Sequence, residues 1–275
     1  MNKKYQFIIF FIITTICVCC SGGEMVQEKI KYKSIEEVSN IAWQELAEKK
    51  IYFGHQSIGF NIIDGLKDIM KENPQIKFKF IESPAASKLK EGNFLHSRVG
   101  ANSDPAIKIN DFFNNIDNGL GNKVDFAFLK FCYFDVVDKT DVKKVFENYS
   151  NNMDELIKKY PKTNFIHFTV PLTISKSNWK TWLKKTIGKG EMWEYNANIK
   201  RNDFNNLLVE KYGSNVFDLA KIESTDNMNR RVSFTYKSKT YYSMCPEYTN
   251  DGGHFNEIGR KKIAEQLLIH LVNMR

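Results

Sequence analysis

The sequence predicts an α/β protein in which one parallel sheet is covered by helices on both faces. Short apolar runs alternate along the chain with longer segments whose apolar residues recur at helical spacing. The runs at residues 124–131 and 164–170 are largely apolar throughout, which is typical of strands buried on both faces. With 15 glycines and 6 prolines, the chain has no low-complexity linker that would separate two domains. We therefore expect a single α/β domain with a sheet of about five strands.

The elements follow from local signals in chain order. Helical period predicts helices over residues 35–49, 58–70, 105–116, 141–159, 197–212 and 257–273, and short apolar runs predict strands over 51–53, 76–81, 124–131, 164–170 and 215–219. Ser34 is a plausible cap for the first helix, and Asp104 followed by Pro105 marks the start of the third. Residues 175–193 and 223–248 break the alternation, and we expect them to form loops near a site.

The composition is that of an ordinary globular protein and excludes several function classes. The 275 residues are 42% hydrophobic and 26% charged, which does not fit a disordered or coiled-coil chain. The net charge is +8, from 40 basic and 32 acidic residues. Many lysines recur along the predicted helices, as at residues 143–144 and 158–159, where a solvated face explains them. We therefore expect no nucleic-acid partner.

Residues 1–20 have the layout of an export signal. Two lysines precede an apolar run over residues 7–18 that is short for a membrane span, and two cysteines and Ser-Gly-Gly follow. This layout resembles a bacterial lipoprotein signal, with Cys20 rather than Cys19 as the lipidated residue. An uncleaved N-terminal anchor is the alternative. Both interpretations predict a protein exported to the cell envelope and held at the lipid bilayer.

The mature chain is then expected to have two parts. Residues 21–49 form a tether and an N-terminal helix, and residues 50–275 form the folded domain. Within that domain only Cys132 and Cys245 remain, and whether they pair in an oxidising compartment is left open by the sequence.

Two short segments carry residues that can do chemistry. In the segment Gly54-His55-Gln56-Ser57, the serine lies on a predicted strand-to-helix turn, so its hydroxyl and N–H are expected at the carboxyl edge of the sheet. Asp251 and His254 lie three residues apart just before the last helix. The carboxylate can accept a hydrogen bond from the imidazole Nδ1–H, which leaves Nε2 free to take a proton from a serine.

These two segments resemble the first and last blocks of the SGNH (GDSL-type) hydrolase superfamily. The resemblance covers residues 50–275 and implies a flavodoxin-like three-layer α/β/α sandwich that hydrolyses esters. It implies Ser57 as nucleophile, His254 as general base and Asp251 as the residue that orients the base. The last block is matched by Asp-x-x-His with Gly259 five residues on, whereas the first departs from the common Gly-Asp-Ser, as in a branch with His-rich serine turns.

The resemblance also concerns the oxyanion hole. It implies the backbone N–H groups of Ser57 and Gly100 as donors. The third block of the family, Gly-x-Asn-Asp, is replaced here by residues 129–135, which contain no asparagine. Loss of one such donor costs roughly 10²-fold to 10³-fold in rate. Asn102, Lys130 and Tyr133 are the candidates to replace it, and Asn102 joins the predicted oxyanion hole.

The expected activity is that of an exported serine esterase that removes small acyl groups, such as acetate, from a carbohydrate. The expected partners are an acylated carbohydrate, or another small ester, and the bilayer. No CxxC, HxxxH or HxH cluster occurs, so we expect no metal or other cofactor. Two alternatives remain: an O-acyltransferase with the same triad, and a carbohydrate-binding envelope lipoprotein without activity.

Overall fold

The computed structural model describes residues 32–175 and 193–274, and the elements below lie within these ranges. The helices are α1 (Asn40–Ala47), α2 (Ser57–Glu72), α3 (Pro105–Asn115), α4 (Val142–Lys159), α6 (Trp193–Tyr212), α7 (Leu219–Glu223) and α8 (Glu257–Asn273). The strands are β1 (Ile51–His55), β2 (Lys79–Glu82), β3 (Asn93–Arg98), β4 (Phe126–Leu129), β5 (Asn164–Phe168), β6 (Val216–Phe217), β7 (Ser233–Tyr236) and β8 (Lys239–Tyr242). Single helical turns occur at Ile35–Glu37, Ala86–Lys88, Ile116–Leu120, Tyr133–Asp135, Gly213–Asn215 and Pro246–Tyr248.

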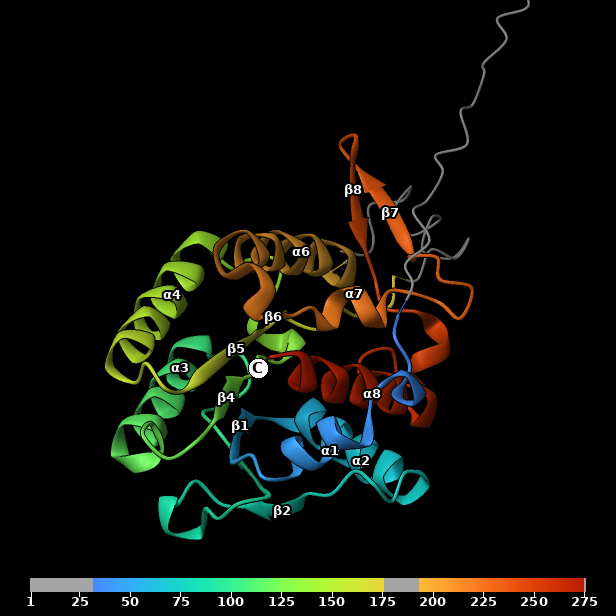
Figure 1. The fold of residues 1–275 in the computed structure, drawn as a ribbon. Coiled ribbons are helices and arrows are strands. Elements are labelled where there is room, and N and C mark those ends of the chain that lie inside the picture. Colours follow the sequence, from blue (N-terminus) through green and yellow to red (C-terminus); the bar gives the residue numbers. More distant parts are fainter. Residues whose placement is uncertain (1–31, 176–192, 275) are drawn as a thin grey trace, which may run out of the picture.

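Six strands form one parallel sheet in the order β2-β3-β1-β4-β5-β6. Without the edge strand β2, the order along the chain is second, first, third, fourth and fifth, which is the flavodoxin order. Helices α1, α2 and α8 cover one face of the sheet, and α3, α4 and α6 cover the other (Figure 1). The predicted flavodoxin-like three-layer α/β/α sandwich is confirmed.

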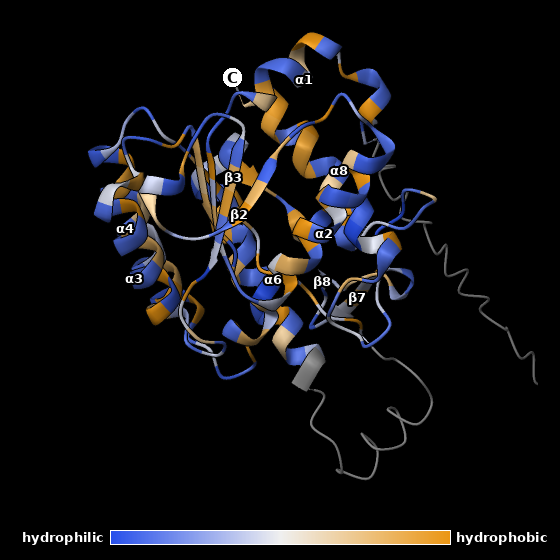
Figure 2. Ribbon diagram, turned by 90° about the horizontal axis from the view of Figure 1, so that it is seen from below, coloured by the Kyte–Doolittle hydropathy of each residue, from blue (hydrophilic) through white to orange (hydrophobic). Residues whose placement is uncertain are grey.

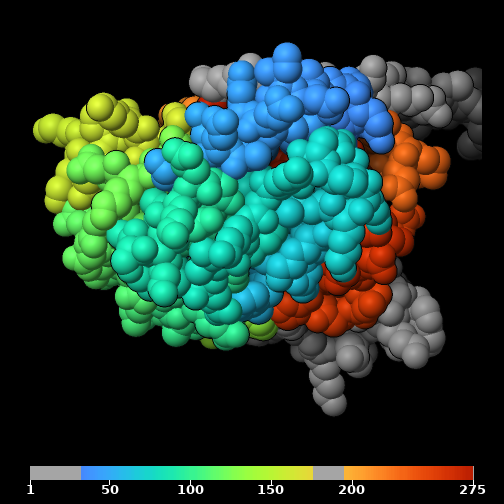
Figure 3. All heavy atoms as spheres, turned by 60° about the horizontal axis from the view of Figure 1, so that its bottom comes forward, coloured from blue at the N-terminus to red at the C-terminus, as the bar shows by residue number. Residues whose placement is uncertain are grey.

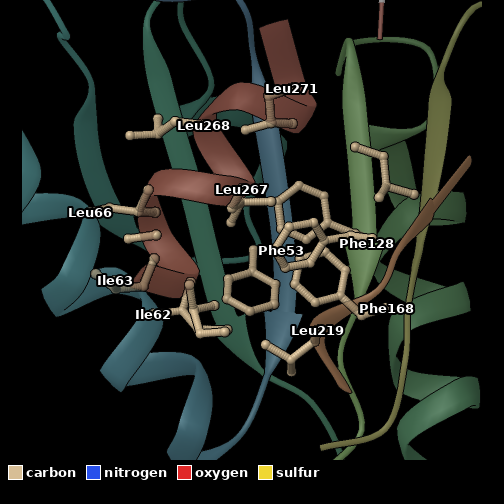
Figure 4. Close-up of a cluster of buried hydrophobic side chains, with 14 of the residues drawn as sticks. Phe53, Ile62, Ile63, Leu66, Phe128, Phe168, Leu219, Leu267, Leu268 and Leu271 are labelled. Carbon is tan, nitrogen blue, oxygen red and sulfur yellow. The ribbon is translucent and has the colours of Figure 1, made fainter. Parts of the chain in front are cut away.

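The sheet is buried on both faces because successive residues of each strand point to opposite sides. On one side, the rings of Phe53, Phe128 and Phe168 pack together in a cluster, with centroid separations of 4.9, 5.0 and 5.7 Å. Ile62 of α2 and Leu267 of α8 pack over these rings (Figure 4). Hydrophobic residues accordingly face the sheet and hydrophilic residues the outside along most helices (Figure 2).

The packing of α2 against α8 is close and is what brings the two chemistry-bearing segments together. A Cβ atom on Gly65 of α2 would lie 2.3 Å from the carbonyl oxygen of Arg260 on α8, so the helices touch through a glycine. Arg260 also donates from Nε to Asp68 Oδ2 at 2.8 Å. On the surface, α2 (cyan) and α8 (red) lie next to each other (Figure 3). Since α2 begins at Ser57 and α8 follows His254, this contact fixes the separation of those two residues.

The prediction missed strand β3, which lies between β2 and β1. Its sequence, Asn-Phe-Leu-His-Ser-Arg, carries polar residues at positions that are buried in the sheet, which hid the strand. These polar groups have partners that the sequence does not reveal: Ser97 Oγ lies 2.8 Å from the hydroxyl of Tyr52, and Asn93 Nδ2 donates to Lys88 O at 2.9 Å. The sheet therefore has six strands rather than about five.

Three other boundaries differ from the prediction. The expected helix over residues 35–49 is split, because Ser34 caps the single turn Ile35–Glu37 and Ser39 caps the separate helix α1. The strand expected over 215–219 ends at Phe217, and Leu219 already begins α7, for which Asp218 is the cap. The segment 223–248 contains the antiparallel β7–β8 hairpin, which projects beyond α6 and α7 (Figure 1).

Parts of the sequence-based predictions lie outside the described residues. These include the signal segment 1–20 with its cysteines and most of the tryptophan-rich segment 175–193. Among the helices of the described ranges, none is both long enough and apolar enough to cross a bilayer.

Candidate active site

Ser57 is the first residue of α2 and follows directly on β1, with Gln56 as the N-cap. The Gln56 side chain donates to the carbonyls of Val99 and Gly100 at 3.0 and 2.7 Å, which ties this turn to the loop after β3. Because a helix N-terminus has unpaired N–H groups, the Ser57 N–H has no acceptor within its own helix. The turn lies between β1 and β4, where the order of connections along the sheet reverses and where folds of this kind bind ligands.

Ser57, His254 and Asp251 form a continuous hydrogen-bonded relay. His254 Nδ1 lies 2.7 Å from Asp251 Oδ2, and His254 Nε2 lies 3.2 Å from Ser57 Oγ. A carboxylate only accepts, so Nδ1 carries the proton and the Nε2 of the neutral imidazole accepts from the serine hydroxyl. Asp251 and His254 lie three positions apart in the sequence, whereas Ser57 lies 194 positions before Asp251. The structure therefore brings all three residues together in the order serine, histidine, aspartate.

Asp251 is held in its charged form by the loop that carries it. Its Oδ1 accepts from the backbone N–H groups of Gly253 and His254 at 2.9 and 2.8 Å. Partial burial raises the pKa of Asp251, but these two bonds and the His254 ring outweigh that effect and hold the pKa below its usual value. A carboxylate charged at neutral pH can stabilise the imidazolium that forms when His254 takes a proton.

The ring of Tyr133 packs edge-to-face against the imidazole of His254. Its ring centroid lies 5.8 Å from that of His254 at a steep angle, and a Cβ on Gly253 would come within 2.8 Å of its ring. Burial, with help from the negative charge of Asp251, raises the pKa of Tyr133 to about 12. The hydroxyl is therefore protonated at neutral pH. The outer side of the site is open, since the His254 side chain is 38% exposed.

The predicted oxyanion donors differ in how they are bonded. The Gly100 N–H donates to Asp111 Oδ2 at 2.7 Å, and it is free for a substrate only if that bond is given up. The exposed Asn102 accepts at Oδ1 from Lys108 Nζ at 2.9 Å, which leaves its amide NH₂ group to donate elsewhere. Lys130 is fully buried and its Nζ donates to Phe131 O at 3.1 Å, so it faces the interior.

Two buried polar pairs near the site were missed from the sequence. Lys108 Nζ and Asp135 Oδ2 form a fully buried ion pair at 2.5 Å that joins α3 to the turn after β4. Asp135 also accepts from the backbone N–H of Cys132 at 2.6 Å and of Ser103 at 2.9 Å. Burial of a charge is tolerated only with such partners, so this pair holds the Asn102 loop and the Tyr133 turn in a fixed arrangement.

The second missed pair is that of His55, the last residue of β1, and His96 of the adjacent strand β3. His55 Nδ1 lies 2.9 Å from Gln56 O, so it donates there, and the neutral ring accepts at Nε2 from His96 Nδ1 at 3.0 Å. Burial lowers the pKa of His55 to about 3. A Cβ on Gly59 would lie 2.1 Å from the His55 ring, so this ring sets the turn that carries Ser57. Recognising β3 would have placed these histidines on adjacent strands.

Both cysteines of the domain are thiols in this structure. Cys132 and Cys245 are buried and are not joined to each other. Within residues 32–175 and 193–274, no group of three or more His, Cys, Asp or Glu side chains is arranged to hold a metal ion.

No family model matches the chain, and no curated protein matches it. Solved structures similar to it include the lipase/acylhydrolase from Enterococcus faecalis, with 13% identity, a TM-score of 0.47, and coverage of 82% of this chain and 96% of that one. Another is the lipopolysaccharide acetyltransferase periplasmic domain from Salmonella ser. Paratyphi A, with 12% identity, a TM-score of 0.45, and coverage of 82% and 86%. A third is described as an acetyl esterase mutant with acetate ion, with 13% identity, a TM-score of 0.41, and coverage of 81% and 96%. At such low similarity, no property of these proteins is assigned to this chain.

Proposed function

We propose that the protein is an SGNH-type serine hydrolase that cleaves small acyl esters, with Ser57 as its nucleophile. The observation that carries this proposal is the relay from Ser57 Oγ through His254 to Asp251, located after β1 at the ligand-binding edge of the sheet.

The reaction would proceed in two steps. Ser57 Oγ attacks the ester carbonyl while His254 Nε2 takes its proton, and the same proton then passes to the departing alcohol. Water enters through the open side of His254, loses a proton to Nε2 and attacks the acyl carbonyl. The bond to Ser57 Oγ then breaks, the acid is released, and the proton passes from Nε2 to Oγ. Asp251 holds the imidazole in the required tautomer throughout and stabilises its positive charge.

The oxyanion hole of the proposed enzyme is built from the Ser57 N–H and the Asn102 amide. The Ser57 N–H lies at a helix N-terminus, whose partial positive charge favours a developing anion. Lys108 bonds the oxygen of Asn102, which favours the amide group as a donor. Gly100 remains a third candidate on the condition that its N–H exchanges Asp111 for the substrate.

We further propose that the ester is carried by an exported carbohydrate. This follows from the predicted signal in residues 1–20, with anchoring through Cys20, and from the aromatic and polar character of residues 223–248.

An O-acyltransferase is the second candidate, because the open face of His254 admits a sugar hydroxyl as readily as water. Product analysis with an acceptor sugar present separates the two. A binding protein without activity would show neither reaction.

The first test is hydrolysis of 4-nitrophenyl acetate and of an acetylated glycan by the wild type and by Ser57→Ala. We expect the variant to lose at least about 10³-fold in kcat, because the nucleophile is removed. Ser214→Ala, at an exposed serine in the turn Gly213–Asn215, is the matched control and should keep full activity. Equal acetate release by wild type and Ser57→Ala would contradict the proposal.

A further inference from the structure

A second concave site lies beside the loop that leads into α4. It is a cavity of about 660 Å³ between this loop, the outer surface of α6 and strand β8. Its volume falls in the range of sites that bind small molecules or single sugar units. Four lysines line it, Lys139, Lys143, Lys200 and Lys239, together with Asp141 and Asp203.

The charges of this cavity are only partly balanced. Lys239 forms an ion pair with Asp203 at 3.0 Å, and Asp141 caps α4 by accepting from the Lys144 N–H at 3.1 Å. For Lys139, Lys143 and Lys200, no carboxylate partner occurs within the described ranges 32–175 and 193–274. Four lysines and two aspartates give the lining a net charge of +2, and this excess favours an anionic ligand.

A cluster of aromatic rings continues from the same cavity along the hairpin. Lys239 Nζ lies 5.0 Å from the ring centroid of Tyr241 on β8, which is buried and stacks on the half-buried Phe234 of β7 at 5.9 Å. Phe234 in turn packs against Tyr195 of α6 at 4.3 Å, and the neighbouring Tyr236 is 37% exposed. Aromatic faces pack well against the apolar faces of sugar rings. Lys239 thus belongs to both the lysine-lined cavity and the aromatic hairpin.

The cavity lies close enough to the proposed triad for one extended ligand to occupy both. Lys139 at the cavity lies six positions after Tyr133, whose ring contacts His254. Six residues span at most about 22 Å when fully extended, so a glycan of several units can occupy both places. Both Tyr133 and Lys139 lie in the segment between the carboxyl end of β4 and the start of α4.

We propose that the lysine-lined cavity and the aromatic hairpin form a binding subsite for an acidic glycan, with the cavity holding a carboxylate, sulfate or phosphate group. The inference rests on the proposed function, since it names the class of carbohydrate that carries the ester. It makes the domain selective for anionic over neutral polymers and leaves the cleavage of small esters unaffected.

Binding is tested in the full chain with Ser57→Ala as background, so that no turnover interferes. The probes are unesterified polygalacturonate, dextran sulfate, neutral dextran and single-stranded DNA. We expect polygalacturonate or dextran sulfate to bind, and the triple variant Lys139→Gln/Lys143→Gln/Lys200→Gln to bind at least about tenfold more weakly. The comparison of the two anionic polymers identifies the preferred group. The control, Lys123→Gln/Lys158→Gln/Lys162→Gln, removes the same charge from exposed lysines elsewhere and should bind like its parent.

The same lysine variants with Ser57 intact test the effect on turnover. For acetylated polygalacturonate, we expect the cavity variant to raise KM with kcat unchanged, and to hydrolyse 4-nitrophenyl acetate at the wild-type rate. Equal weakening by the cavity and control variants, binding of neutral dextran as tight as that of the anionic polymers, or tightest binding to single-stranded DNA would overturn the proposal. Because the binding arm needs no activity, the subsite can be supported even if the triad proves inactive.

Discussion

The chemistry of the site depends on how His254 is held. Its Nδ1 is bonded to Asp251 at 2.7 Å, whereas its Nε2 lies at the longer distance of 3.2 Å from Ser57 Oγ. The shorter bond fixes the tautomer, and the longer one tightens when the serine begins to lose its proton. In the proposed mechanism the carboxylate is therefore the group that positions the base, although its side chain is 58% exposed.

This arrangement predicts the effect of Asp251→Asn. The amide can present an N–H to Nδ1, which favours the tautomer with its proton on Nε2 and removes the acceptor for Ser57. We expect kcat for 4-nitrophenyl acetate to fall by about 10²-fold to 10⁴-fold. Asp64→Asn, on the exposed side of α2, is the control and should retain full kcat. A fall of less than about threefold for Asp251→Asn would show that His254 does not need this carboxylate.

The Asn102→Ala variant removes the proposed oxyanion donor on the loop after β3. If the amide of Asn102 donates to the oxyanion, its removal lowers kcat by roughly 10²-fold to 10³-fold with little change in KM. The measurement is steady-state hydrolysis of 4-nitrophenyl acetate over a range of concentrations. An unchanged kcat would transfer the role to another donor, of which the Gly100 N–H is the first to examine.

Among the elements, the pair α2 and α8 determines the geometry of the site. Each helix begins within three residues of a member of the triad, and the two meet where Gly65 lies under the backbone of Arg260. Charged contacts at the edge, such as Lys261 Nζ to Glu72 Oε1 at 2.8 Å, add little because they are solvent-exposed. The close glycine contact is therefore the feature that sets the separation of the helices.

The variant Gly65→Ala tests whether this glycine contact sets the separation of α2 and α8. The added methyl group would come within 2.3 Å of the Arg260 carbonyl oxygen, so the helices must separate. We expect a loss of about 1–3 kcal/mol in the free energy of unfolding, together with a lower kcat because Ser57 moves away from His254. Asp64→Ala, at the exposed neighbouring position, should change neither the free energy of unfolding nor kcat by much. A Gly65→Ala protein with wild-type stability would contradict the close contact.

For the whole molecule, the buried histidines link stability to pH. In the folded protein, burial lowers the pKa of His55 to about 3 from the ordinary value of 6.5. Between these two values the unfolded chain binds a proton that the folded chain does not, so the free energy of unfolding falls as the pH falls. Burial also lowers the pKa of His96, His167 and His270, and the same reasoning applies to each.

Denaturant unfolding between pH 7 and pH 4 measures this linkage. We expect His55→Gln to show a shallower decline than the wild type, by up to about 1.4 kcal/mol per pH unit below pH 6.5. The variant is also expected to be less stable at pH 7, because the ring fills the space under Gly59. Parallel pH profiles for the two proteins would mean that His55 takes up its proton without unfolding.

The sequence by itself determined the layered α/β architecture, and it singled out Ser57, His254 and Asp251 as the proposed triad. Both follow from local signals: alternating apolar periods, a serine at a strand-to-helix turn, and Asp251 three residues before His254. Such signals are readable because the residues that produce them are close together in the chain.

Only the tertiary structure decided what depends on contacts between distant segments. It revealed strand β3, whose buried polar residues are satisfied by neighbours such as Tyr52, and it placed the Gly100 N–H on Asp111. It also joined Lys108 to Asp135 and gathered lysines from α6, β8 and the loop before α4 around one cavity. A buried polar group is stable only beside its partner, and the partner's position is set by the packing of the whole sheet and its helices.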